Sequence, residues 1–236
     1  MSSSSSPGIR LATAFVPVAV VVTGTCSYFA FSPGSSGSLA FWALALGPTA
    51  LLAAIAAAWA HREDLLRGWL SPRWGDFTRG VLAAAGLFVA GWAVTRAVAP
   101  VGSPREIWLV SLYGQLGDPR VLQAHAPAVA ATIAVAAFVE ELVWRGAVTQ
   151  LLAERVGSRV AWVWAAGLYT LALAPTAWAL RGPEGINPLL ILAAAGGGLV
   201  WGGLARFFGS LAPGILAHAL FDWAVLMMFP FWGPPR

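Results

Sequence analysis

Long apolar stretches separated by short polar connections dominate the sequence. Seven of them are long enough to cross about 30 Å of hydrocarbon at 1.5 Å of rise per residue. Backbone groups in lipid must be paired within the segment, and the stretches lack the alternation of barrel strands, so we expect helices. The pattern predicts an all-α, polytopic membrane bundle of about seven transmembrane helices: Leu11–Phe31, Leu39–Ala60, Val81–Ala99, Ala126–Leu152, Val160–Leu180, Leu189–Ala205 and Leu211–Phe229.

The composition agrees with this pattern. Of the 236 residues, 58% are hydrophobic and 10% charged, whereas a soluble domain carries about 25% charged residues. Thirteen tryptophans fit a protein whose aromatic side chains lie at the lipid headgroups. The 14 basic residues are all arginines and form no basic cluster, so no nucleic-acid partner is predicted. The single cysteine, Cys26, excludes an intramolecular disulfide.

The arginines also indicate a topology. The polar residues 1–10 lack a charged signal region, and the first apolar stretch lacks a cleavage site, so we expect the first helix to be retained. The connection 61–78 and a helix over Arg105–Leu116 are expected to lie along the membrane interface. Eight arginines fall on the side of the N-terminus and five on the other, which favours an N-terminus inside: Arg10, Arg62, Arg67, Arg73, Arg79, Arg155, Arg159 and Arg206 against Arg96, Arg105, Arg120, Arg181 and Arg236.

The composition changes near Ala126. Before this residue the predicted helices hold almost no ionisable group away from their ends, and after it acids, an arginine and a histidine occur within apolar stretches. We therefore divide the chain into N-terminal helices with interfacial loops, 1–125, and a catalytic core, 126–236. The small residues of the tract Ala193–Gly203 predict close packing of the sixth helix.

The segment Glu140-Glu141-Leu-Val-Trp-Arg145 places three charges inside an apolar stretch. Each charge at mid-bilayer costs at least about 2.5–3.5 kcal/mol, so such residues usually mark function. Glu141 and Arg145 are four residues apart, about 40° on a helix, and are expected to pair. Glu140 is expected to point elsewhere and to be the carboxylate suited to proton transfer. The alternative is a charge cluster that only fixes helix packing.

His218 and Asp222 form a second pair with the same spacing in the last apolar stretch. A carboxylate at Asp222 is expected to fix the tautomer and orientation of His218, leaving one ring nitrogen for a substrate or a water molecule. Together with Glu140 in one small bundle, this pair predicts a hydrolytic site.

Metal binding is the weaker hypothesis. A zinc site requires three or more His, Cys or carboxylate ligands, and His61 and His125 are expected in loops. No HExxH motif occurs. We therefore predict no cofactor and no metal site, with a divalent metal held by Glu140, His218 and Asp222 as the alternative.

Together these two segments resemble the CPBP family of intramembrane proteases, which are related to CAAX prenyl endopeptidases and to bacteriocin-processing or self-immunity proteins. The resemblance covers roughly Arg120 to Trp232, about half of the chain. It is carried by Glu140-Glu141-x-x-x-Arg145 and by Gly209-Ser-Leu-Ala-Pro213 followed by His218-x-x-x-Asp222.

This resemblance implies a glutamate peptidase of the bacterial inner membrane. Glu140 activates a water molecule that attacks a peptide carbonyl, while His218 and Asp222 hold that water or the developing oxyanion. Glu141 and Arg145 buttress the site. The implied partners are the lipid bilayer and a membrane-embedded or lipid-modified protein substrate.

The chain departs from the family in one motif. The family usually has an FxxxH motif on an intermediate helix, where this chain has Tyr169 for the aromatic residue and Leu173 for the histidine. Loss of one such donor typically costs on the order of 10²–10³ in rate. Two functions follow: a variant protease that uses Tyr169 or a substrate group instead, or a non-catalytic membrane scaffold or immunity protein. A proton-coupled transporter is a third class, but the chain shows no internal repeat.

Overall fold

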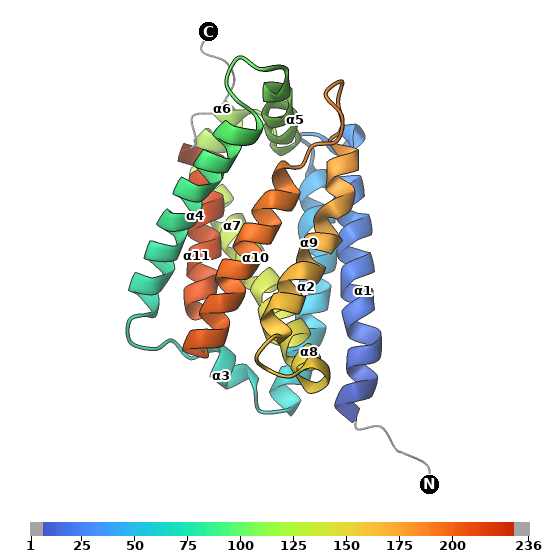
Figure 1. Ribbon diagram of the computed structural model, residues 1–236, viewed down its shortest axis with the longest axis vertical. Coiled ribbons are helices and arrows are strands. Elements are labelled where there is room, and N and C mark those ends of the chain that lie inside the picture. Colours follow the sequence, from blue (N-terminus) through green and yellow to red (C-terminus); the bar gives the residue numbers. More distant parts are fainter. Residues whose placement is uncertain (1–6, 229–236) are drawn as a thin grey trace.

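The structure is a computed structural model and describes residues 7–228. It is a bundle of helices in which the start of the first helix and the end of the last one lie at opposite ends (Figure 1). Within the described residues no strand forms, apart from an isolated bridge between Gly182 and Gly185. The predicted all-α fold is confirmed. The elements are α1 (Pro7–Ala30), η1 (Pro33–Ser35), α2 (Leu39–Arg62), α3 (Leu66–Leu70), α4 (Asp76–Val98), η2 (Pro104–Glu106), α5 (Ile107–Leu116), α6 (Pro119–Ala124), α7 (Ala126–Glu141), η3 (Leu142–Val148), α8 (Thr149–Val156), α9 (Ala161–Ala179), α10 (Leu189–Phe208), α11 (Ala212–Trp223) and η4 (Ala224–Met228).

All seven predicted membrane segments are helical. The first starts four residues early, so that Pro7–Arg10 of the predicted polar tail belongs to α1. The last predicted residue, Phe229, lies outside the described residues. Among the described residues, four helices are long and apolar enough to cross a membrane: Leu39–Arg62, Asp76–Val98, Ala126–Val156 and Leu189–Phe208, with shorter apolar helices at Ala14–Ala30 and Ala212–Met227.

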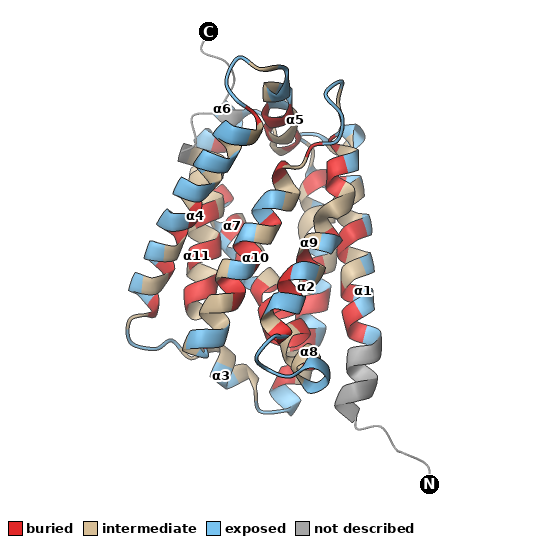
Figure 2. Cartoon of the chain, in the orientation of Figure 1, coloured by how far each residue is buried: buried red, intermediate tan, exposed pale blue. Residues whose placement is uncertain are grey.

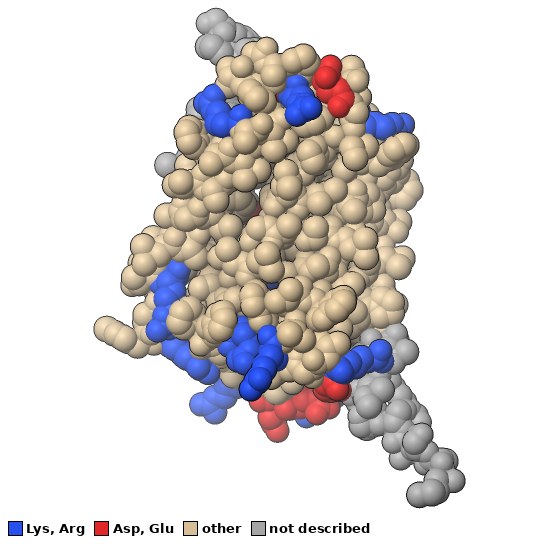
Figure 3. All heavy atoms as spheres, in the orientation of Figure 1, with Lys and Arg blue, Asp and Glu red and all other residues tan. Residues whose placement is uncertain are grey.

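The outer surface of the bundle is apolar. On α4, Leu82 and Val89 are 67% and 63% exposed, and Figure 2 shows exposed residues along the outer side of this helix. On the face shown in Figure 3 the charged residues gather mainly toward the two ends, with an uncharged band between them. A surface of this kind faces lipid. The chain is an integral membrane protein.

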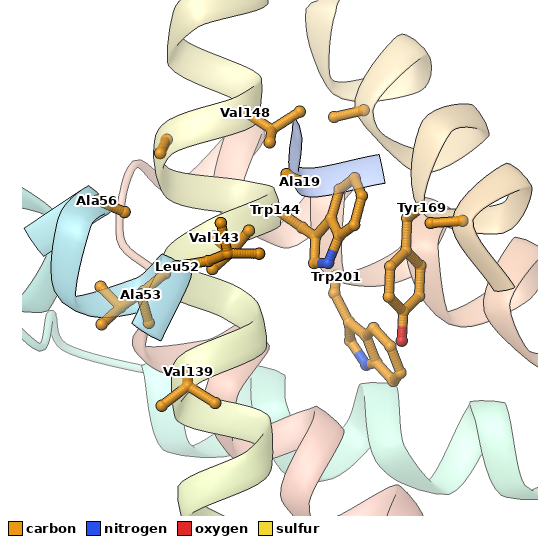
Figure 4. Close-up of a cluster of buried hydrophobic side chains, with 14 of the residues drawn as sticks. Ala19, Leu52, Ala53, Ala56, Val139, Val143, Trp144, Val148, Tyr169 and Trp201 are labelled. Atoms are coloured by element: carbon orange, nitrogen blue, oxygen red, sulfur yellow. The ribbon is translucent and has the colours of Figure 1, made fainter. Parts of the chain in front are cut away.

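The core of the bundle surrounds the centre of the long α7–η3–α8 helix. Val143 and Trp144 are almost fully buried there, among side chains of α1, α2, α9 and α10 (Figure 4). This core unites residues from both sides of position 126, and the division into 1–125 and 126–236 stays a prediction. Close packing of α10 agrees with its small residues, because a Cβ at Gly198 would lie 3.3 Å from the Cβ of Ala166 on α9.

The helix is widened directly after the two glutamates. Residues 142–148, η3, form a π-helix, and all seven of them are buried. Such segments are rare and frequently lie at functional sites. Gly146 within it has no side chain, which leaves room for the ring of Trp69 on α3: a Cβ at Gly146 would lie 2.8 Å from this ring. The connection 61–78, predicted to lie along the interface, therefore also packs against the core.

The second predicted interfacial helix is present as η2 and α5. It does more than lie along the surface, because Trp108, Leu109 and Tyr113 are buried against the start of α10 at Leu189. Asn187, fully buried, joins the two elements: its side chain donates to the backbone oxygen of Trp108 and accepts from the backbone N–H of Leu189. Helix α5 therefore closes one end of the bundle.

Candidate active site

Glu141 lies at the centre of the polar cluster. It is fully buried, and its Oε1 atom is 3.1 Å from Nη1 of Arg145, which is the predicted pairing. The same oxygen is 3.0 Å from Nδ1 of His218 on α11. Glu141 therefore joins an arginine one turn further along its own helix to a histidine 77 residues away.

His218 is held on three sides. Its Nε2 atom is 3.4 Å from Oδ2 of Asp222, and its ring stacks on that of Trp201 from α10, with centroids 3.7 Å apart and planes 13° apart. Both nitrogens face a carboxylate, Nδ1 that of Glu141 and Nε2, at the longer distance, that of Asp222, so the use of one ring nitrogen by a substrate or water stays a prediction. The longer distance, to Asp222, is on the side that reaches the cavity described below.

The close approach of Glu141 to α11 depends on a glycine. Gly214 lies one turn before His218, and a Cβ at this position would be 3.1 Å from Oε2 of Glu141. A side chain here would displace the carboxylate or the helix. A glycine at this site therefore permits the contact between Glu141 and His218.

Arg145 is buried between two aromatic rings. Its guanidinium carbon lies 4.6 Å from the ring centroid of Tyr169 and 5.0 Å from that of Trp201, and its side chain is 2% exposed. A guanidinium over aromatic faces gains cation–π attraction, which is stronger where water is excluded. Together with Glu141, these rings compensate the buried charge.

Glu140 is separate from this cluster but close to it. Its side chain is partly buried, and Oε2 accepts a hydrogen bond of 2.8 Å from the hydroxyl of Tyr169 on α9. The expectation that Glu140 and Arg145 point apart is only partly met, because both contact Tyr169. The reason is that the backbone widens from Leu142 onward, so the angle between Glu140 and Arg145 is no longer that of a regular α-helix.

A cavity of about 370 Å³ is shared by several ionisable side chains. Glu140, Tyr169, His218 and Asp222 line it together, whereas Leu173 contributes an apolar side chain. Most of the remaining lining is apolar and comes from α2, α4, α5 and α10. A carboxylate and an imidazole from distant parts of the sequence therefore share one space inside the bundle, as the sequence predicted.

The described residues contain no group of three or more His, Cys, Asp or Glu side chains arranged to hold a metal ion. His61 lies in the last turn of α2 rather than in a loop, and His125 follows α6; both are exposed and neither lines the cavity. The absence of a metal site stays a prediction.

Two residues of the site were not singled out from the sequence. Trp201 was expected only to take part in helix packing, as a member of the glycine-rich tract, and it carries the stacked ring of His218. Gly214 was not identified, although its place four residues before His218, on the same face of the helix, was an available signal.

Comparison with known protein families supports the motif analysis. Residues 122–224 match the model of a family described as type II CAAX prenyl endopeptidase Rce1-like. The match confirms the predicted resemblance to the CPBP and CAAX protease-like family, and it contains all of the polar residues of the cavity named above. No curated protein and no solved structure matches the chain. Residues 122–224 are therefore similar to this family of type II CAAX prenyl endopeptidases.

Proposed function

We propose that this protein is an intramembrane endopeptidase in which Glu140 activates water. The observation that carries the proposal is the cavity inside the bundle that Glu140 shares with His218 and Asp222. Ionisable side chains at membrane depth are costly and usually functional. The match to an endopeptidase family supports the same class of reaction.

In the proposed reaction a water molecule lies between Glu140 and the scissile carbonyl. The carboxylate accepts a proton from the water while the water oxygen attacks the carbonyl carbon, which opens the C=O bond to an alkoxide. Collapse of this tetrahedral intermediate re-forms the carbonyl and breaks the C–N bond. The proton held by Glu140 passes to the leaving amine, and the carboxylate is regenerated.

His218 is proposed to stabilise the negative charge on the oxygen. In the proposed step His218 is the doubly protonated imidazolium: Nδ1 donates to Glu141, and Nε2–H is the donor that faces the substrate. At 3.4 Å from Asp222 it is not engaged in a short hydrogen bond and has room to contact a carbonyl oxygen. Donors held in place before the reaction stabilise a developing oxyanion most effectively. Glu141, itself paired with Arg145, and the stacked ring of Trp201 hold the His218 ring in place.

The partners and the location follow from the same proposal. The substrate is a membrane-embedded or lipid-modified protein, because the cavity lies within the bundle and is lined mainly by apolar side chains. We place the protein in a bacterial inner membrane with its N-terminus inside, as the arginine distribution favours. No metal takes part in the proposed steps.

Substitution of Glu140 tests the proposal. Glu140→Gln keeps the shape of the side chain and removes the base, so we expect cleavage to fall by a factor of about 10²–10⁴. The assay follows fragments of membrane-anchored and lipidated peptides by mass spectrometry in proteoliposomes. Glu154→Gln, on the exposed part of α8, is the matched control. Unchanged cleavage by the Glu140 variant would remove this residue from the mechanism.

The second candidate is a non-catalytic scaffold or immunity protein. The observation that favours it is Leu173, which gives the cavity an apolar side chain where the family usually has a histidine. In a strain that lacks the protein, Glu140→Ala separates the two functions. Full rescue of the deletion phenotype by this variant favours the scaffold, and failure to rescue by a normally abundant variant favours the peptidase.

A further inference from the structure

Tyr169 connects α9 to the proposed base. It lies in the middle of the helix, is 5% exposed, and its hydroxyl donates a 2.8 Å hydrogen bond to Oε2 of Glu140 on α7. Hydrogen bonds to an ionised acceptor are about twice as strong as those between neutral groups. This contact therefore fixes one of the two carboxylate oxygens.

The ring of Tyr169 is itself held in place. The guanidinium of Arg145 lies over it at 4.6 Å, and Trp144 packs against it edge to face, with centroids 5.3 Å apart. Figure 4 shows the ring beside both Trp144 and Trp201. On the α10 side, Gly198 has no side chain; a Cβ there would lie 3.5 Å from Cδ1 of the ring. A ring enclosed in this way has little freedom to move its hydroxyl.

The other tyrosine of the cavity behaves differently. Tyr113 also lines the cavity, but its hydroxyl donates to the backbone oxygen of Val225. On α9, the described residues that line the cavity are Tyr169 and Leu173, and of these Tyr169 alone has a polar side chain. A hydroxyl directed at the carboxylate is thus a feature of position 169 and not of cavity tyrosines in general.

We infer that Tyr169 is a positioning residue for Glu140: it holds Oε2, so that Oε1 takes the proton of the attacking water. The inference rests on the proposed function and assigns to this chain a polar partner on α9 that does not depend on a histidine at position 173. Holding a reacting group within a fraction of an ångström is worth up to about 10² in rate.

Tyr169→Phe tests the inference because it removes the hydroxyl and keeps the ring between Trp144 and Arg145. We expect kcat to fall about 10- to 100-fold with KM changed less than about twofold, since the proposed loss is one of orientation and not of binding. The matched control is Thr170→Val, which removes the neighbouring hydroxyl on α9. Among the described residues that hydroxyl donates within its own helix, to the backbone oxygen of Ala166.

A second measurement does not depend on turnover. The membrane-permeant reagent dicyclohexylcarbodiimide modifies carboxyl groups, and mass spectrometry of the purified protein gives the rate at Glu140. We expect this rate to rise at least about threefold in Tyr169→Phe, because Oε2 loses its donor, and to stay unchanged in Thr170→Val.

The outcomes separate the two proposals. Wild-type kcat and labelling in Tyr169→Phe, beside an inactive Glu140→Gln, overturn the positioning role and leave the proposed function standing. A higher KM with unchanged kcat in Tyr169→Phe also overturns the positioning role. So does an equal fall of kcat in Thr170→Val, because a purely structural role then explains the result. An active Glu140→Gln contradicts the proposed function, and the labelling rate alone then decides whether Tyr169 holds the carboxylate.

Discussion

Replacing Arg145 by alanine should cost much more stability than replacing an ion-paired arginine whose own side chain is partly exposed. The Glu141–Arg145 pair has side chains 0% and 2% exposed, so Arg145→Ala leaves a carboxylate in the core with His218 as its only remaining charged partner among the described residues. Breaking a buried pair in this way costs about 3–5 kcal/mol. At 1.4 kcal/mol per factor of ten, the unfolding equilibrium should shift by more than about 100-fold.

The chain offers a control with the same N–O distance. Arg79 and Asp76 are also 3.1 Å apart; Asp76 is 5% exposed, but the arginine is 37% exposed, and ion pairs screened by solvent are worth about 0–1 kcal/mol. Asp76 in addition keeps its hydrogen bond from the backbone N–H of Arg73. Arg79→Ala should therefore change the free energy of unfolding by less than about 1 kcal/mol.

The assay is unfolding in mixed micelles followed by tryptophan fluorescence, with the free energy of unfolding compared among variants. The double variant Glu141→Gln/Arg145→Met should regain most of the stability lost in Arg145→Ala, because it removes both charges at once. Equal losses in Arg145→Ala and Arg79→Ala, or no recovery in the double variant, would refute the reasoning that burial makes this pair structural.

Two further predictions concern the site itself. Gly214→Ala should lower kcat by at least about tenfold, since the new Cβ would lie 3.1 Å from Oε2 of Glu141 and displace the carboxylate that holds His218. Gly86→Ala is the control, because this glycine of α4 has open space around its Cβ position. Treatment of the active protein with EDTA or 1,10-phenanthroline should leave the cleavage rate unchanged, because His218 directs both nitrogens to carboxylates and the described residues show no metal-ligand group. Loss of activity that returns on addition of Zn²⁺ would contradict this second prediction.

Local patterns predicted the parts of this structure that depend on neighbouring residues. The apolar stretches located the helices, because a helix in lipid satisfies its backbone within one segment. The spacing of Glu141 and Arg145 predicted their pairing, because residues four apart share a helix face. The charged residues within apolar stretches indicated the candidate site, because such charges are expensive at membrane depth.

Contacts between distant segments were not accessible in the same way. The hydrogen bond between Glu141 and His218 joins residues 77 positions apart and depends on how α7 packs against α11. The stack of His218 on Trp201 requires the third helix of the cluster, α10. From the sequence, Tyr169 was the aromatic residue of a motif and one of the groups that a variant protease would use instead of the histidine. Its partner Glu140 becomes visible only in the folded bundle.

The widened backbone at Leu142–Val148 absorbs one residue more than an ordinary α-helix of the same rise would hold. Because the extra residue is taken up within the segment, the helix beyond it continues in the direction and register of a regular winding. Loss of one residue from 142–144 would tighten this turn and place Arg145 three residues after Glu141, a spacing that still permits pairing. A one-residue deletion is therefore the change that removes the widened turn without altering any charged side chain.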